Sequence, residues 1–329
     1  MEFRTVVKCG ESLKKIGYAT PFMMIGSCFA ENLGERLKRL KFNVILNPFG
    51  IVYHPAPLAQ NMMRIIGGEP YTADDLEQHN ELWTSFDHHG RFSHPDVAVC
   101  LTRMNTELQQ AREQLARSEW LFVTFGTAWG YRRKASGRIV ANCHKYPASD
   151  FERIRFGVDE IRDIWAETIA AIQRFNPAVK VVFSISPIRH LRDGAHENQL
   201  SKSTLLLAVD KLNREYKSNN QLNETENNIC YFPAYEIVLD DLRDYRFYDE
   251  NMTHPNASAI NYIWQRFCET LIDNDALKTM KIVENIIKAL SHKPLHQTSE
   301  YGKFAEKQLE MIAKLKRQAP FLDFTEGDF

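Results

Sequence analysis

The apolar residues of this chain form short continuous runs separated by longer stretches in which apolar residues recur every three or four positions. The short runs have the length of strands that are buried on both faces, and the longer stretches have the period of helices. Strands that alternate with helices are typical of a parallel sheet covered on both sides, so the pattern predicts a three-layer α/β fold. The predicted strands lie at residues 23–25, 42–46, 120–125, 179–185 and 229–232.

Two segments depart from this alternation. Residues 67–96 are polar and aromatic, and they are predicted to form an insertion with a solvated hairpin whose tip lies at residues 88–91. Residues 276–329 are predicted to form a helical C-terminal extension to an α/β domain at residues 1–275. The extension ends in an apolar stretch at residues 321–324, which is expected to dock on the domain or on a partner.

Composition narrows the class of protein. The chain has 329 residues and a formal net charge of -1, without the basic excess of most nucleic-acid-binding proteins. The start of the sequence has no signal-peptide pattern, and no apolar stretch is long enough to span a membrane. Six scattered cysteines include no C-x-x-C pair, so neither a zinc ribbon nor a disulfide framework is expected. These features predict a cytoplasmic protein without membrane or nucleic-acid partners, and leave its oligomeric state open.

Unusual polar loops follow four of the predicted strands. The carboxyl ends of parallel strands lie at one edge of a sheet, where ligands bind in open α/β folds. A later loop that carries His254 is expected at the same edge. The convergence predicts a site built from residues 26–30, 47–50, 126–130 and 186–190.

The simplest chemistry for such a site is nucleophilic catalysis. Ser27 and Cys28 stand at the turn from the first strand into a helix, where a thiolate and an oxyanion are both favoured. His254 is the candidate base, since an imidazole activates a hydroxyl or thiol within hydrogen-bond reach. Asn251, three residues earlier, is the candidate group that orients the imidazole, with the carboxylates of Asp249 and Glu250 as alternatives.

Each of these residues also has a purely structural interpretation. Ser27 is a favoured N-cap residue, because apolar helical spacing starts directly after it. Cys28 is equally interpretable as a buried thiol, and His254 as a residue that precedes a helix. The histidines at 88, 89 and 94 lack companion ligands at metal-binding spacing, so neither a metal nor another cofactor is expected.

Two further polar positions lie on the loops at the strand ends. His144 is a candidate substrate contact, although it could equally be packed structurally. Arg189 belongs to a basic cluster that is interpretable either as a solvated loop or as a clamp for an anion at the rim of the pocket.

At the first strand end, the segment Ile25-Gly26-Ser27-Cys28-Phe29-Ala30 resembles the signature of the GSCFA family, within the wider SGNH (GDSL-like) hydrolase group. The resemblance extends over about residues 10–270. It implies a flavodoxin-like five-stranded sheet and the hydrolysis of esters, often of acyl groups on sugars or lipids. Supporting stretches lie at residues 47–50, 124–129, 141–145, 186–187 and 254–256.

The resemblance also assigns roles to individual residues. SGNH proteins begin with Gly-Asp-Ser, so alignment on Gly26 places Cys28 at the nucleophile and Ser27 at the Asp position. The last block is Asp-x-x-His in the group, and here Asn251 stands in place of the Asp before His254. A thiol pairs with an imidazole without a carboxylate behind it, as in Cys-His-Asn proteases. Cys28, His254 and Asn251 are therefore the predicted triad, with Ser27 as the alternative nucleophile.

The alignment leaves the oxyanion donor unassigned. The group uses Gly-x-Asn in its third block, but Ala128 occupies the Asn position and has no donor side chain. An asparagine from another loop or a backbone N–H has to substitute for it. The candidate oxyanion and substrate-binding residues are Gly50, Asn47, Gly126, Thr127, Asn142, His144 and Arg189.

These observations predict an ester hydrolase or acyltransferase that acts through an acyl-enzyme on an acylated carbohydrate or another small ester. The alternative is a catalytically inactive binding protein on the same scaffold, an interpretation favoured by Ala128 and Asn251. A weaker alternative assigns an interaction role to the helical extension.

Overall fold

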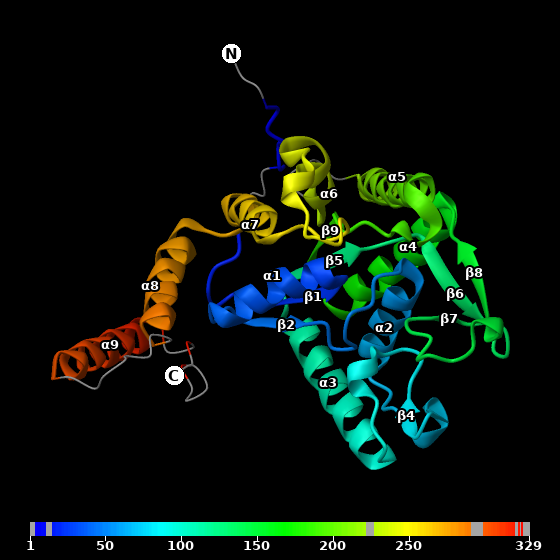
Figure 1. Cartoon of the computed structure of the whole chain (residues 1–329), viewed down its shortest axis with the longest axis horizontal. Helices are drawn as coiled ribbons and strands as arrows, with labels where there is room; N and C mark the ends of the chain where they lie inside the picture. The colour runs from blue at the N-terminus through cyan, green and yellow to red at the C-terminus, as the bar shows by residue number, and fades with distance from the viewer. Residues whose placement is uncertain are drawn as a thin grey trace.

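The computed structural model describes residues 4–10, 15–221, 227–290, 299–319, 322 and 324. Its centre is a five-stranded, all-parallel sheet with the strand order β10-β9-β5-β1-β2 (Figure 1). This order is the flavodoxin-like one, in which the chain reverses direction across the sheet after its second strand. The five predicted strands and the predicted topology are thus confirmed. The strands are β1 (Phe22–Gly26), β2 (Val44–Leu46), β5 (Trp120–Phe125), β9 (Lys180–Ile185) and β10 (Ile229–Phe232).

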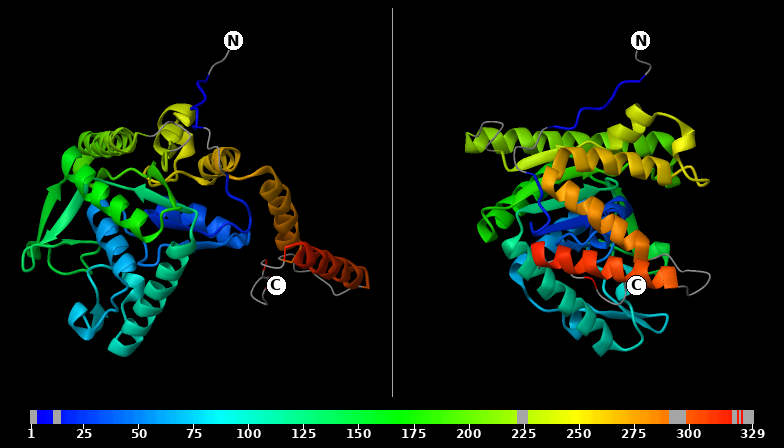
Figure 2. Two further views of the ribbon diagram at one scale, coloured as in Figure 1. Left: turned by 180° about the vertical axis from the view of Figure 1, so that it is seen from behind. Right: turned by 90° about the vertical axis from the view of Figure 1, so that its left-hand side faces the viewer.

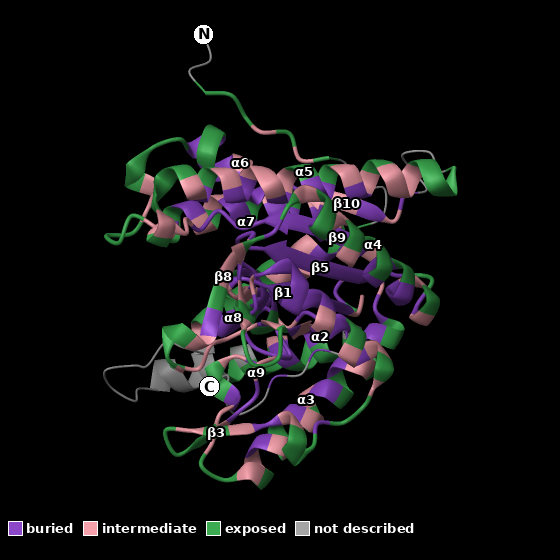
Figure 3. Ribbon diagram, turned by 90° about the vertical axis from the view of Figure 1, so that its right-hand side faces the viewer, coloured by how far each residue is buried: buried purple, intermediate pink, exposed green. Residues whose placement is uncertain are grey.

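The alternation of side chains along each strand divides the core into two layers. In β1, Phe22 and Met24 contribute to one apolar cluster, and Met23 and Ile25 contribute to the other. The first cluster includes α1 (Cys28–Arg39) and α7 (Ala257–Leu271), and the second is covered by four other helices (Figure 3). Because both faces of the sheet are covered, its strands are almost entirely apolar. The four helices are α2 (Pro55–Gly67), α3 (Val97–Arg117), α4 (Val158–Phe175) and α5 (Gly194–Asn220).

The inserted segment contains the expected hairpin, formed by β3 (Glu77–His79) and β4 (Leu82–Thr84). The predicted position of the tip, at residues 88–91, was wrong. The turn lies instead at Asn80 and Glu81, whose φ angles are 48° and 64°. Two successive left-handed residues make a tight turn that suits the twist of a two-stranded ribbon. The predicted tip instead carries the buried side chain of His88, whose ring stacks on Phe49 at 4.7 Å.

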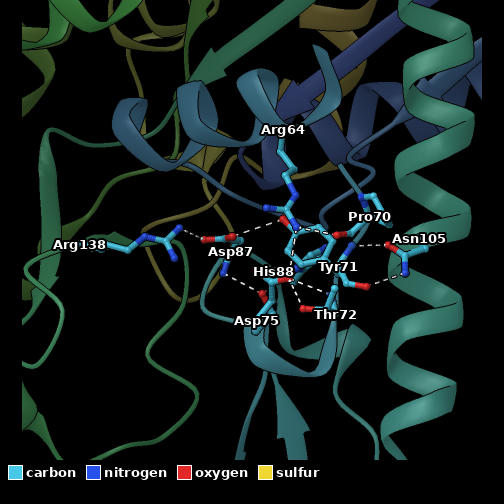
Figure 4. Close-up of polar contacts among 10 residues, drawn as sticks. Arg64, Pro70, Tyr71, Thr72, Asp75, Asp87, His88, Asn105 and Arg138 are labelled. Carbon is cyan, nitrogen blue, oxygen red and sulfur yellow. Dashed lines mark hydrogen bonds and ion pairs between the residues drawn. The ribbon is translucent and has the colours of Figure 1, made fainter. Parts of the chain in front are cut away.

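Polar contacts fasten this segment to the domain (Figure 4). The hydroxyl of Tyr71 donates to Asp87 Oδ2 at 3.3 Å, and Arg138 binds Asp87 Oδ1 at 2.9 Å. Asn105 of α3 accepts a hydrogen bond from the backbone N–H of Tyr71 and donates one to its carbonyl oxygen.

The imidazole of His88 is neutral, because burial lowers its pKa to about 3. A buried, neutral ring therefore occupies the place where a solvated histidine was expected.

A second sheet occupies a region that was predicted as a loop. It consists of the antiparallel strands β6 (Trp129–Arg133), β7 (Ile139–Val140) and β8 (Phe151–Arg155). The loop prediction was wrong because these strands mix aromatic and charged residues and are only partly buried, so they lack a continuous apolar run. Three residues separate the end of β5 from the start of this sheet, which therefore begins close to the predicted site.

The C-terminal helices α8 (Asn274–Leu290) and α9 (Ser299–Gln318) lie to one side of the domain (Figure 2). Val283, Ile286 and Ile287 of α8 share an apolar cluster with α1 and α7. In the final stretch, Leu322 and Phe324 are buried, whereas its other two residues, 321 and 323, lie outside the described residues. This part of the extension therefore docks on the domain.

The remaining elements are short helical segments. They are η1 (Ala73–Asp75), η2 (Gly90–Phe92), η3 (Ala148–Asp150), η4 (Leu191–Asp193), α6 (Ala234–Glu236), η5 (Ile237–Leu242) and η6 (Tyr245–Phe247). Across the described ranges, none of the helices is both long and apolar enough to cross a membrane.

The turn after β1 gives a test of the fold. Gly26 has a φ of 137°, and a Cβ atom there would lie 2.3 Å from the carbonyl oxygen of Thr124. We expect Gly26→Ala to lower the free energy of unfolding by about 2–3 kcal/mol, as measured by urea denaturation. Gly67→Ala is the matched control, because no atom lies within 4 Å of a Cβ there. Equal stability of the two variants would contradict this account of the turn.

Candidate active site

The turn between β1 and α1 is held by hydrogen bonds to both neighbouring strands. The backbone N–H of Gly26 donates to Asn47 Oδ1 at 2.8 Å, and the N–H of Ser27 donates to the carbonyl oxygen of Thr124 at 3.3 Å. Val52 N–H binds the carbonyl oxygen of Gly26. The ends of β1, β2 and β5 are therefore fixed relative to one another, as the convergence of strand ends predicted.

Ser27 is the N-cap of α1. Its side chain is 3% exposed, and its Oγ accepts a hydrogen bond from the backbone N–H of Phe29 at 3.3 Å. A capping oxygen takes up one of the N–H groups that a helix leaves unpaired at its start. The hydroxyl of Ser27 therefore has a structural partner, and the residue is absent from the lining of the neighbouring cavity.

Cys28 is the first residue of α1 and lies in the wall of a cavity of about 470 Å³. Burial raises the pKa of the Cys28 thiol above its ordinary value, and the negative charge of Glu31 raises it further. The backbone N–H of Cys28 itself acts in the opposite direction, as expected at a helix N-terminus, but it is outweighed. The helix N-terminus thus favours the thiolate as expected, but removal from water is the larger effect and the pKa of the thiol is raised.

The polar groups of the loop after β2 form hydrogen bonds with other residues of the protein. Asn47 is buried, and its Nδ2 donates to Glu31 Oε2 at 2.5 Å. The N–H of Gly50 donates to the carbonyl oxygen of Asn47 at 2.7 Å, closing the turn. The N–H of Ile51, a residue of the cavity wall, has no acceptor within the described residues. Backbone N–H groups at Cys28 and Ile51 are therefore the available oxyanion donors on this side.

The loop after β5 is similarly engaged. The hydroxyls of Thr127 and Ser201 lie 2.9 Å apart, and Ser201 Oγ accepts from the N–H of Ala128. The N–H of Gly126 donates to the carbonyl oxygen of Tyr53. Gly126 and Thr127 thus shape the edge of the sheet through backbone and hydroxyl contacts.

Lys202 is a residue at this edge that the sequence analysis did not single out. Its side chain is buried in α5, and Nζ donates at 2.6 Å to the carbonyl oxygens of Gly126 and Ser186. Burial lowers the pKa of Lys202 to about 7. The sequence contained a signal for the burial of Lys202. Position 202 lies at helical spacing from Leu205 and Val209 and therefore on the same apolar face of α5.

On the loop that follows β7, the predicted residues Asn142 and His144 have different surroundings. Asn142 lies in the wall of the cavity beside Cys28, and its Oδ1 accepts from the N–H of His144 at 2.9 Å. His144 Nε2 lies 2.7 Å from the carbonyl oxygen of Ser85, and burial lowers the pKa of its imidazole. His144 therefore anchors this loop to the inserted segment.

Arg189 lies at a different hollow. Its Nη1 donates to the carbonyl oxygen of Met252 at 2.8 Å, and its guanidinium lies over the rings of Tyr245 and Tyr248. Among the basic residues of this loop, it is Arg192 that lines the cavity with Cys28.

The loop that carries His254 has the predicted contact with Asn251. Asn251 Oδ1 accepts from the backbone N–H groups of Thr253 and His254, at 2.8 and 3.0 Å. Its Nδ2 lies 3.0 Å from His254 Nδ1. Because two backbone donors fix the amide oxygen, the amide nitrogen faces the ring. Asp249 is exposed and contacts His254 through the backbone, where its N–H donates to the carbonyl oxygen of His254 at 2.8 Å.

His254 and Cys28 lie at the same edge of the sheet, without a hydrogen bond between them in the described part of the chain. The connection runs through Tyr53, which shares the cavity wall with Cys28, and His190, whose ring centroid lies 5.4 Å from that of Tyr53. Burial lowers the pKa of His190 to about 3, and the nearby Lys202 and His254 act in the same direction. The phenol of Tyr53 and the neutral imidazole of His190 thus lie in the region that contains both the predicted nucleophile and the predicted base.

Within the described residues, no three His, Cys, Asp or Glu side chains come together as a metal site. The arrangement instead consists of a half-buried thiol, backbone N–H groups and a nearby imidazole held by an amide. These groups suit acyl-group chemistry or the binding of a small ligand.

The solved structures to which this chain is similar include two esterases. One is a carbohydrate esterase family 3 protein from Talaromyces cellulolyticus, with 9% identity, a TM-score of 0.35, and coverage of 81% of this chain and 99% of that chain. The other is an acetyl xylan esterase from the rumen bacterium Butyrivibrio proteoclasticus, with 13% identity and a TM-score of 0.39. That match covers 80% of this chain but only 65% of the esterase chain. No match to a curated protein was found.

Family models match along most of the sequence. The model of the GSCFA family matches residues 21–267, which include the turn at Gly26 and the loop of His254. A second model, described as the C-terminal domain of GSCFA domain proteins, matches residues 283–327. Since the first model alone spans well over half of the sequence, this chain belongs to the GSCFA family.

Proposed function

We propose that this protein hydrolyses a small ester or acylated carbohydrate, or transfers its acyl group, with Cys28 as the nucleophile. The observation that carries the proposal is the position of Cys28 at the start of α1, directly after a buried strand and in the wall of a cavity of about 470 Å³. Ser27 Oγ caps the helix, whereas Cys28 forms part of the cavity wall. The resemblance to SGNH hydrolases assigns the same residue.

In the proposed reaction, the thiol of Cys28 gives its proton to His254, and Sγ bonds to the carbonyl carbon of the ester. The carbonyl electron pair moves to oxygen, where the N–H groups of Cys28 and Ile51 donate hydrogen bonds. Cleavage of the ester C–O bond then releases the alcohol, which takes the proton back from His254. Water or a second alcohol then attacks the carbonyl carbon of the thioester while His254 takes its proton. The C–S bond breaks, the thiolate of Cys28 receives that proton, and a carboxylic acid or a new ester is released.

This sequence requires a change at His254. Two groups lie 3.0 Å from His254 Nδ1: Asn251 Nδ2, which can only donate, and the hydroxyl of Thr253, which also contacts Asn251 Oδ1. The donor amide favours a neutral ring that carries its proton on Nε2. A ring in this state donates from Nε2 instead of accepting a thiol proton there. His254 must therefore move to approach Cys28 and shift its own proton to Nδ1 before it acts as the base.

The same contact favours the second candidate function, a binding protein without turnover. The Asn251 amide holds His254 as a donor, and no hydrogen bond joins His254 to Cys28 in the described structure. A protein of this kind binds its ligand in the cavity and is stabilised by it, but releases no product.

The first test separates two thiols of one cavity. Cys28 and Cys143 both line it and both are half-buried. With 4-nitrophenyl acetate, we expect Cys28→Ala to lower kcat/KM by at least about a hundredfold, because the nucleophile is lost. Cys143→Ala, the matched control, is expected to remain within about threefold of the unaltered protein. Full activity in Cys28→Ala would overturn the assignment of the nucleophile.

The second test replaces the amide that faces His254. Asn251→Asp keeps an oxygen for the N–H groups of Thr253 and His254, and it places a carboxylate oxygen where Nδ2 now donates. That oxygen accepts from Nδ1–H and leaves Nε2 free to take a proton. We expect kcat/KM for ester hydrolysis to rise by about tenfold or more. An unchanged or reduced rate would show that the tautomer of His254 does not limit the reaction.

The third test concerns the resting state of the thiol. Because burial raises the pKa of Cys28, its thiolate fraction is small at pH 7 and increases as the pH rises toward and beyond 9. We expect the rate of iodoacetamide labelling at Cys28, followed by peptide mass spectrometry, to increase about tenfold per pH unit between pH 7 and 8.5. A rate that is already maximal at pH 7 would indicate an ion pair of Cys28 with an imidazolium.

A further inference from the structure

The cavity beside Cys28 has a cation in its wall and no acidic side chain. Arg192 is the cation, and no Asp or Glu is among the lining residues. Its guanidinium donates to the hydroxyl of Tyr131 and lies 5.7 Å from the centre of that ring. Within the described residues, no carboxylate lies at ion-pair distance from Arg192. The positive charge therefore lacks a protein counter-ion at the cavity.

Other charged groups near the cavity do not cancel this one. Arg153 also binds the Tyr131 hydroxyl and is paired with Asp193, and its Nε is buried without a hydrogen-bond partner. Glu31 faces Cys28 and His89, but its charge is paired with Arg91, whose Nη1 lies 3.7 Å from Glu31 Oε1. Burial lowers the pKa of His89, which favours its neutral form in the wall. The field in the cavity is therefore that of an uncompensated arginine.

The rest of the wall suits a ligand with apolar and hydroxylated faces. Four aromatic rings line the cavity, and the Asn142 side chain adds a polar group. The Oδ1 of Asn142 is occupied by the N–H of His144, whereas its Nδ2 has no partner within the described residues. A donor amide beside an arginine provides a site for carboxylate oxygens. The rings belong to Tyr53, Tyr131, Tyr146 and Phe151.

We propose that the substrate bound beside Cys28 carries a carboxylate, which Arg192 binds, so that the protein prefers anionic esters to neutral ones. This inference rests on the proposed function for the site and deepens it. The carboxylate belongs either to the acyl group or to the alcohol, as in an acetylated uronic acid. Arg192 is thus a residue that determines specificity and takes no part in bond cleavage.

The experiment compares esters matched in chain length that differ in charge. For the acyl side, the probes are mono-4-nitrophenyl glutarate and 4-nitrophenyl valerate, with uncatalysed hydrolysis subtracted. For the alcohol side, acetate release is measured from acetylated glucuronic acid and acetylated glucose. We expect kcat/KM to be at least about tenfold higher for the anionic member of one pair. A preference for neither anionic ester would overturn the proposal while leaving hydrolysis by Cys28 intact.

Variants assign the preference to one side chain. Arg192→Gln is expected to abolish the preference, because KM rises for the anionic ester at least about tenfold more than for the neutral ester. Arg192→Lys should retain part of it. Arg132→Gln is the matched control, because it also removes one positive charge, but Arg132 of β6 is paired with Glu152 and does not line the cavity. This variant should keep the full preference for the anionic ester. Equal loss in Arg192→Gln and Arg132→Gln would contradict a direct contact.

A binding measurement decides the inference if no ester is turned over. Glucuronate is then expected to raise the Tm of the unaltered protein, and glucose at the same concentration is not. The Arg192→Gln variant should lose the shift, and added salt should weaken it. Equal effects of the two sugars would overturn the proposal without reference to catalysis.

Discussion

The site depends on the hydrogen bond from the backbone N–H of Gly26 to Asn47 Oδ1. A side chain at position 26 would collide with the carbonyl oxygen of Thr124, so only glycine lets β1 approach β5 this closely before the chain turns into α1. Asn47 in turn binds Glu31 of the first turn of α1. One buried amide thus joins the ends of two strands to the start of a helix, and this fixes the position of Cys28.

The electrostatics of the edge follow from burial more than from charge pairs. The thiol of Cys28, the imidazole of His190 and the ammonium of Lys202 are all shifted toward their neutral forms by removal from water. The guanidinium of Arg192 differs from these groups, because it is exposed at the cavity and keeps its charge, with no carboxylate at ion-pair distance within the described residues. It is therefore the group of the cavity wall most able to select a ligand by charge.

The fold was predictable where one physical effect dominated the sequence. Strands buried on both faces have to be almost wholly apolar, so β5 and β9 were evident as continuous apolar runs in the sequence. The strands β6 and β8 were not, because a half-exposed ribbon such as Trp129–Arg133 mixes aromatic and charged residues. His88 was misplaced for a related reason, since an imidazole is polar in a sequence but packs as a neutral ring once Phe49 covers it.

The site was predictable in its local contacts and less so in its long-range ones. A spacing of three residues was enough to anticipate the contact between Asn251 and His254, and apolar helical spacing identified Ser27 as a cap. Sequence could not show that Asn47 is already engaged by Glu31, or that Arg192, not Arg189, reaches the cavity of Cys28. Those outcomes depend on how separate loops pack against each other.

The central claim is that Cys28 forms a covalent acyl intermediate. The most direct measurement is intact-protein and peptide mass spectrometry after brief incubation with an activated acetate ester and acid quenching. The account predicts one acetyl group per chain, which peptide fragmentation assigns to Cys28 itself and not to the neighbouring Ser27, and which neutral hydroxylamine removes. An acetyl group on Ser27 or Cys143, or turnover without any acylated peptide, would contradict it.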